Sequence, residues 1–149
     1  MGLSDVSNIL WRERQLLELL LFKLEEEQLI LNSQRPRWLD HATREVETVI
    51  SELYRLDLER TDAIQALATE MGMPGLPTLK TLAEQESGPW VRIFEEHRNA
   101  LRHLATEIDK LANSNRDDVL RGQRAAHATL KVFGDEPRME GISEFDQAV

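Results

Sequence analysis

Apolar residues recur three and four positions apart along most of the chain, a spacing that places them on one face of an α-helix. The first such stretch covers residues 4–32 and stops before Pro36, and the second covers residues 37–71 and stops at Gly72. Proline interrupts helical hydrogen bonding, and glycine readily takes the left-handed conformation that ends a helix. Two long helices are therefore predicted.

A connection rich in proline and glycine follows, and then the helical pattern returns. Residues 72–89 include three prolines and three glycines. They enclose one short apolar pattern, which predicts a short helix over residues 78–85. A third long helix is predicted from Pro89. Its apolar seam weakens at Asn115 and Gly122, and a glycine in a helix interior costs about 1 kcal/mol relative to alanine. Residues 116–133 are therefore predicted to be the most loosely packed part of the bundle.

The pattern as a whole predicts an all-α fold, an antiparallel bundle of three long helices with one short connecting helix. Residues 1–134 are predicted to form this helical-bundle domain. Residues 135–149 contain five acidic residues, one basic residue and a proline. Such a segment buries too little apolar surface to fold alone, so it is predicted to be a flexible acidic tail.

Charge and composition narrow the possible partners and location. Asp and Glu outnumber Lys and Arg by 27 to 18, which gives a net charge of −9, and there are no cysteines. An excess of negative charge repels phosphate backbones, so nucleic acid is not an expected partner. A disulfide framework is impossible, and neither a signal peptide nor a membrane-spanning segment is recognisable. These features favour a cytoplasmic protein.

Catalytic and metal-binding patterns are not found, which predicts that the chain is not an enzyme and carries no cofactor. No two of the four histidines stand three or four residues apart, as helical metal ligands do. His97 falls on an apolar seam, where a hydrogen-bonded core histidine is the favoured interpretation. The acidic run Glu25–Glu27 is interpreted as a solvated face, because successive helical residues point in different directions.

Two groups of large apolar residues allow more than one interpretation. Trp11, Trp38 and Trp90 each lie near the start of a predicted helix, where core or end packing is favoured over an aromatic binding set. The apolar belt 16–22 spreads around its helix. Packing within the bundle is favoured for this belt, and contact with a partner protein is the alternative.

Several segments taken together resemble the FlgN-type flagellar export chaperones. The similarity extends over roughly residues 3–133. It rests on the leucine-rich segment 16–24 followed by Glu25-Glu26-Glu27-Gln28-Leu29, on Arg37-Trp38-Leu39, on Glu45 and Glu59-Arg60, on Met71-Gly72, and on Asn113-Ser114-Asn115-Arg116.

The resemblance implies a chaperone that binds the hook–filament junction proteins FlgK and FlgL before type III export and keeps their terminal helices from premature assembly. Export-apparatus components are further candidate partners. In the family the C-terminal helical region captures the client, which here corresponds to residues 116–133. The candidate contacts are Val119, Leu120, Ala126, Leu130, Val132 and Phe133, with Ile142 and Phe145 as outer candidates.

Three alternatives remain open at this stage. The seam from Val119 to Phe133 can equally serve to complete the bundle core. The chain can instead be a coiled-coil adaptor or a self-associating structural protein without an export role. A histidine phosphotransfer domain is disfavoured, because neither His41 nor His103 lies in the His-x-x-Lys-Gly setting typical of such domains.

Overall fold

The computed structural model describes residues 2–85 and 88–132, and this part of the chain is almost entirely helical. Its elements are α1 (Gly2–Asn32), the 3-10 turn η1 (Pro36–Trp38), α2 (Leu39–Glu70), α3 (Leu79–Gln85) and α4 (Pro89–Val132). No strand occurs in the described ranges. The predicted all-α fold with three long helices and one short connecting helix is confirmed. The predicted tail, residues 135–149, lies outside the described residues.

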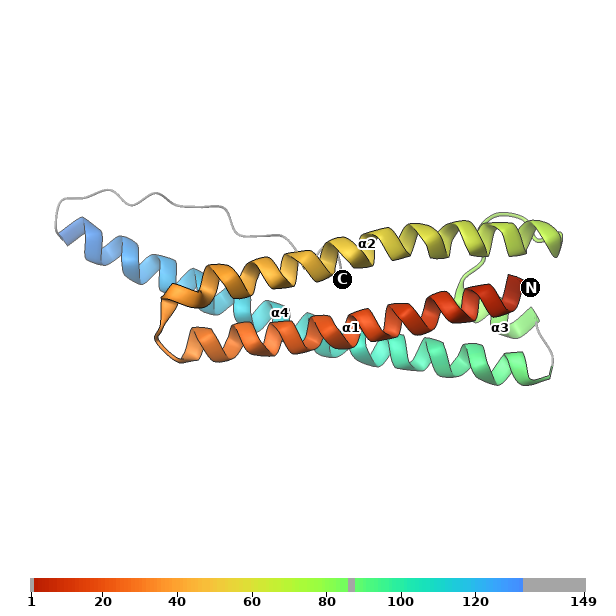
Figure 1. Ribbon diagram of the computed structural model, residues 1–149, viewed down its shortest axis with the longest axis horizontal. Coiled ribbons are helices and arrows are strands. Elements are labelled where there is room, and N and C mark those ends of the chain that lie inside the picture. Colours follow the sequence, from red (N-terminus) through yellow and green to blue (C-terminus); the bar gives the residue numbers. More distant parts are fainter. Residues whose placement is uncertain (1, 86–87, 133–149) are drawn as a thin grey trace.

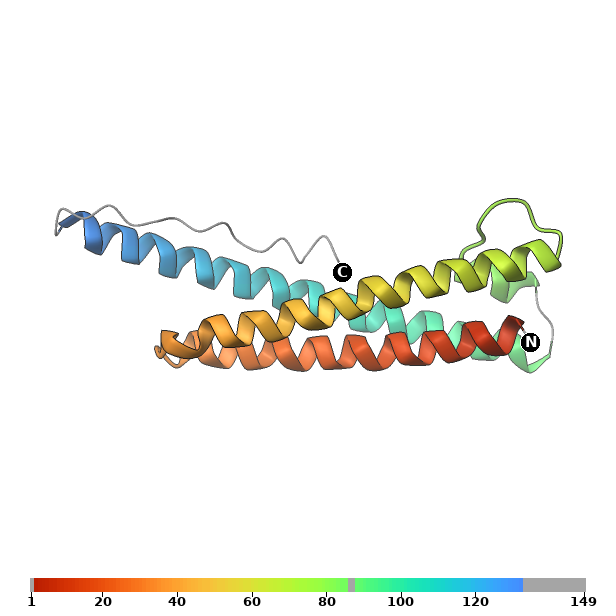
Figure 2. The same cartoon turned by 45° about the horizontal axis from the view of Figure 1, so that its top comes forward.

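The three long helices run up, down and up, with α1 between the other two (Figure 1). α1 packs along α2 on one side and along α4 on the other, whereas α2 and α4 approach each other at far fewer points. The short α3 packs on α4 at the end of the bundle that holds the N-terminus (Figure 2). α1 is thus the common support on which both other long helices depend.

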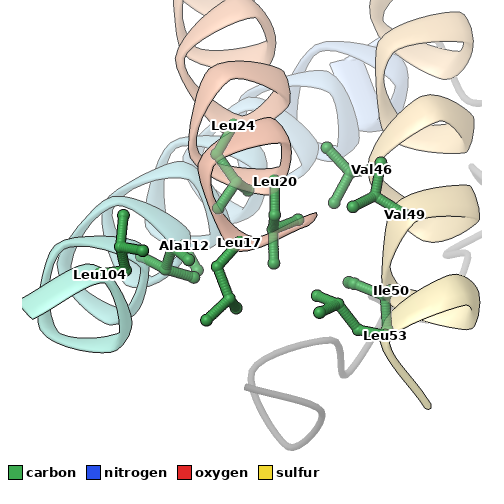
Figure 3. Close-up of a cluster of buried hydrophobic side chains, with 10 residues drawn as sticks. Leu17, Leu20, Leu24, Val46, Val49, Ile50, Leu53, Leu104 and Ala112 are labelled. Carbon is green, nitrogen blue, oxygen red and sulfur yellow. The ribbon is translucent and has the colours of Figure 1, made fainter. Parts of the chain in front are cut away.

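Two apolar clusters hold the bundle together. The middle cluster joins the three long helices and comprises Leu17, Leu20, Leu24, Val46, Val49, Ile50, Leu53, Leu104, Ile108 and Ala112 (Figure 3). The cluster at the N-terminal end of α1 adds α3 and comprises Val6, Leu10, Ile64, Leu67, Leu82 and Phe94. Burial of such side chains contributes about 25 cal/mol per Å² of apolar surface removed from water. Burial of these two clusters therefore holds the long helices together.

The loop between α2 and α4 begins with a glycine stop. Gly72 has a φ of 69°, and the Met73 amide donates to the Ala68 carbonyl at 2.9 Å. This left-handed geometry satisfies the last carbonyls of α2 and turns the chain away. The following short helix is capped by Thr78, whose Oγ1 accepts from the Thr81 amide at 3.1 Å. Local sequence therefore determines both boundaries.

The prediction of core or end packing is confirmed for Trp90 and wrong for Trp38, and it holds in part for Trp11, whose ring meets the buried His97 ring edge-on with centroids 5.0 Å apart. Trp90 stacks on Phe94 with ring centroids 5.9 Å apart. Trp11 and Trp38 remain 49% and 53% exposed. Arginine side chains lie over both rings, Arg14 over Trp11 at 4.0 Å and Arg37 over Trp38 at 4.8 Å. A cation over an aromatic face stabilises a ring that stays in contact with water.

The apolar belt 16–22 does not pack wholly inside the bundle. Leu17 and Leu20 are buried in the middle cluster, as expected. Leu19 and Phe22 are 40% and 56% exposed, so the prediction of internal packing alone is wrong for these two residues. The cause is the position of α1, which has neighbours on two sides and an outer face that neither neighbour covers.

Candidate partner-binding site

The far end of α4 extends past the helix that supports it. α1 and α4 run in the same direction, with Ser7 hydrogen-bonded to His97 and Asn115 to the Leu24 carbonyl. These contacts join residues 90 and 91 positions apart. The offset places Asn32, the last residue of α1, level with Gly122 of α4. Residues 123–132 therefore continue beyond the end of α1, and Figures 1 and 2 both show this end of α4 projecting past the α1–α2 turn.

A buried polar cluster joins all three long helices just before α4 loses this support. The Asn115 amide donates to the Leu24 carbonyl at 2.8 Å and to the Glu27 carboxylate at 3.0 Å. Thr43 of α2 donates to the other Glu27 oxygen at 3.0 Å. Burial raises the pKa of Glu27, and the bonds from Thr43 and Asn115 oppose that rise. We call these residues, Glu27, Thr43 and Asn115, the polar clamp.

The polar clamp corrects two sequence-based interpretations. The sequence predicts a solvated Glu27, yet this residue is 2% exposed. It also predicts that Asn115 weakens the seam, yet Asn115 is fully buried and hydrogen-bonded. The burial of Glu27 could have been inferred from residue spacing in the sequence. Val6, Glu13, Leu20 and Glu27 stand seven residues apart, and this spacing keeps them on the buried seam of a packed helix.

A partly buried ion pair also lies on this seven-residue spacing. Glu13 accepts two bonds from Arg60 at 2.9 Å, and Arg60 also contacts Asp57. Burial raises the pKa of Glu13, although the charge of Arg60 acts in the opposite direction. The arginine that interrupts the apolar stripe of α2 is therefore neutralised by an acid that interrupts the stripe of α1.

Beyond the polar clamp, the described side chains of α4 are only partly covered. Val119 and Leu120 are half-buried, while Arg121, Gly122 and Arg124 are exposed. Arg121 forms an ion pair with Asp118. Residues 119–132 include three basic residues and no acidic one, in a chain whose net charge is −9. The end of α4 thus differs in charge from the rest of the protein.

The predicted contact residues are only partly described. Val119 and Leu120 lie on α4 beside its exposed basic residues. Ala126, Leu130 and Val132 also lie on α4, but their side chains are outside the described part. Phe133, Ile142 and Phe145 lie outside the described residues altogether. The assignment of these residues as client contacts therefore stays a prediction.

His97 is buried and hydrogen-bonded, which confirms its predicted role in the core. Its Nε2 lies 3.0 Å from Ser7 Oγ, and its Nδ1 lies 3.3 Å from Arg14. A catalytic Ser–His pair needs a base whose second nitrogen faces a carboxylate or another acceptor. Here that nitrogen faces a cation, and burial together with Arg14 lowers the pKa of His97. This arrangement suits a packed neutral imidazole and not a general base.

Within residues 2–85 and 88–132, no three His, Cys, Asp or Glu side chains converge as metal ligands do. None of the described helices combines the length and the apolar character needed to cross a bilayer.

Comparison with known proteins agrees with the resemblance seen in the sequence. The family model described as FlgN protein matches residues 1–138. No curated protein and no solved structure matches the chain. The family match spans far more than half of the 149 residues and covers all the described helices. The chain therefore belongs to the FlgN family and has the general role of that family, a chaperone of flagellar export.

Proposed function

We propose that this protein binds the hook–filament junction proteins FlgK and FlgL in the cytoplasm and holds their terminal helices apart until the type III export apparatus receives them. The client site is the end of α4, residues 116–132, together with Phe133, and Ile142 and Phe145 are outer contacts. The chaperone acts by binding alone, with no catalytic step.

One observation supports the proposal most strongly, the extension of α4 past its support. Residues 123–132 form helix beyond the end of α1, so no part of α1 covers them. An isolated helix of this length is marginal in water and gains most of its stability from packing. A client helix laid along it supplies that packing.

The physical basis is mutual burial of apolar surface. The terminal helix of an assembling filament protein exposes an apolar face before it meets its neighbours, and such a face is prone to aggregate. Docking the face against Val119 and Leu120 removes it from water at about 25 cal/mol per Å². The exposed basic residues Arg124 and Lys131 would favour a client helix with acidic side chains at its edge.

The test measures binding of purified FlgK and FlgL to the full chain by titration calorimetry. We expect Leu130→Asp/Phe133→Asp to abolish binding while far-UV circular dichroism stays close to that of the parent protein. A double variant that unfolds would instead assign both side chains to the core. Val119→Ser/Leu120→Ser then gives an independent second test, because both side chains are only half-buried and their replacement should not unfold the protein. We expect this variant also to bind FlgK and FlgL more weakly.

Two further measurements separate this proposal from its alternatives. Phe22→Ser/Leu29→Ser changes two exposed apolar residues of α1 and is the matched control, which we expect to bind FlgK and FlgL normally. Light scattering reports self-association. A stable dimer with no affinity for either junction protein would contradict the chaperone proposal and favour a coiled-coil adaptor.

A further inference from the structure

The outer face of α1 has exposed apolar side chains, of which Trp11 also meets the buried His97 ring within the bundle. These side chains are Trp11 (49% exposed), Leu19 (40%), Phe22 (56%) and Leu29 (71%). We call this set the α1 ridge. Trp11, Phe22 and Leu29 fall within about 20° of one another on a helix that turns about 100° per residue. Leu19 lies beside this line, about 80° from Trp11, and the polar residues Gln15 and Glu18 lie between Trp11 and Phe22.

Its length suits another helix. Trp11 and Leu29 are separated by five helical turns, which correspond to about 27 Å at about 1.5 Å per residue. Phe22 and Leu29 lie two turns apart on this line, a spacing at which the side chains of a second helix can pack between them. By contrast, the exposed pair Tyr54 and Leu58 on α2 covers a single turn.

The charges beside Phe22 and Leu29 include exposed carboxylates, whereas Arg14 lies over Trp11 at the other end of the ridge. Glu18 and Glu25 are exposed on one side of it and form no ion pair with the described part of the chain. Lys23, which lies over the Phe22 ring at 5.6 Å, is held by Glu45 at 2.9 Å. Uncompensated carboxylates beside an apolar line attract Lys and Arg on an incoming surface. The same charges repel anionic lipid and phosphate backbones, which leaves a protein helix as the occupant.

We propose that the α1 ridge is a second docking surface, which takes a basic amphipathic helix of another protein as a fourth long helix of the bundle. The incoming helix places its apolar stripe on Phe22 and Leu29 and its Lys and Arg side chains against Glu18 and Glu25. The surface lies on a different helix from the client site on α4. The inference therefore stands whether or not the proposed client site is correct.

The probe is a fluorescein-labelled 18-residue peptide of leucine and lysine, patterned as an amphipathic helix and titrated at physiological salt with anisotropy detection. We expect saturable one-to-one binding to the full chain. Phe22→Ser/Leu29→Ser is expected to weaken binding by at least about ten-fold, because a few apolar anchors carry most of the affinity of such interfaces. The matched control, Tyr54→Ser/Leu58→Ser, removes equally exposed residues from α2 and is expected to leave affinity unchanged.

A second pair of variants tests the charge. Glu18→Lys/Glu25→Lys and Glu52→Lys/Asp62→Lys change the net charge equally, and all four residues are exposed. Only the first pair is expected to weaken binding, and a leucine–glutamate peptide of the same pattern is expected not to bind. Equal loss in both pairs, binding of the acidic peptide, or no binding of the basic one would each overturn the proposal.

Self-association is the remaining competitor. If the free protein is a dimer that Phe22→Ser/Leu29→Ser converts to monomer, the ridge belongs to a second copy of this chain and the proposed partner is wrong. Binding of FlgK and FlgL by Phe22→Ser/Leu29→Ser, measured separately, distinguishes a failure of the ridge proposal from a failure of the proposed client site on α4. Loss of peptide binding with normal FlgK binding in this variant would support a second surface, and loss of both would overturn the claim that the two surfaces are separate.

Discussion

The two parts of α4 have the same backbone conformation and very different surroundings. Over residues 89–115 the helix buries Phe94, His97, Ile108 and Asn115 against its neighbours. Over residues 116–132 none of the described side chains is fully buried. Most helix stability in proteins comes from packing of an apolar face and not from intrinsic propensity. One continuous helix can therefore combine a rigid anchor with an end that a partner stabilises.

Removal of a buried ring from the anchored part should have the largest effect. Phe94 is fully buried in the cluster that joins α1, α2, α3 and α4. We expect Phe94→Ala to lower the free energy of unfolding by about 3–5 kcal/mol, through lost burial and the cavity left behind. Leu120→Ala, in the end of the helix, should cost less than about 1 kcal/mol. Urea denaturation followed by circular dichroism measures both, and equal losses would contradict the contrast between the two parts.

The boundary between the two parts depends on the polar clamp, so Asn115→Ala should have the next largest effect. The substitution leaves the buried Glu27 carboxylate without one of its two side-chain donors. We expect a loss of about 1–3 kcal/mol, the cost of a buried polar group that loses a partner. Ser114→Ala, at an exposed neighbouring position, is the control and should change little. An Asn115→Ala variant more stable than the parent would show that the clamp specifies register without adding stability.

The end of the helix can also be stiffened. Gly122 is exposed, and a Cβ added there meets no atom within 4 Å. Gly122→Ala should therefore stabilise α4 locally by up to about 1 kcal/mol. We expect slower amide hydrogen exchange over residues 119–132 and little change in exchange at Phe94. A uniform slowing along all of α4 would mean that the two parts unfold together.

The sequence predicts the helices well because their signals are local. Prolines, Gly72 and the three-and-four spacing of apolar residues define α1, α2, α3 and the start of α4 within a few positions. Each of these signals acts through backbone geometry, which neighbouring residues in the chain determine.

The sequence predicts the surroundings of polar and aromatic residues less well, because these depend on distant partners. Glu27 is buried because Thr43 and Asn115 lie opposite it, and neither relation is visible within a short stretch of sequence. Phe22 is exposed because α1 has a neighbour on only two of its sides. Which side of a helix remains open is decided by the packing of the whole bundle, so the sequence allows both interpretations of the belt 16–22 and does not choose between them.

The smallest expected effect is a pH dependence confined to the anchored part. Burial, and then the charge of Arg14, lower the pKa of His97 below 6.5, while Glu96 acts weakly in the opposite direction. A lowered folded-state pKa means that this histidine supports stability above its unfolded-state pKa and that the support is lost as the pH falls through the folded-state value. Ser7 and Trp11 also contact the ring, and neither carries a charge that could compensate a proton.

Thermal unfolding measured from pH 8 to pH 5 tests this dependence. The buried acids Glu13 and Glu27 have raised pKa values and add stability as the pH falls, so the parent protein alone gives a mixed profile. The difference between the parent and His97→Gln isolates the histidine. We expect the variant to gain stability relative to the parent as the pH falls below about 6.5, and an exposed control, His103→Gln, to keep the parent profile. A constant difference across the range would mean that the folded-state pKa of His97 equals its unfolded-state pKa, and would contradict the lowering by burial and Arg14.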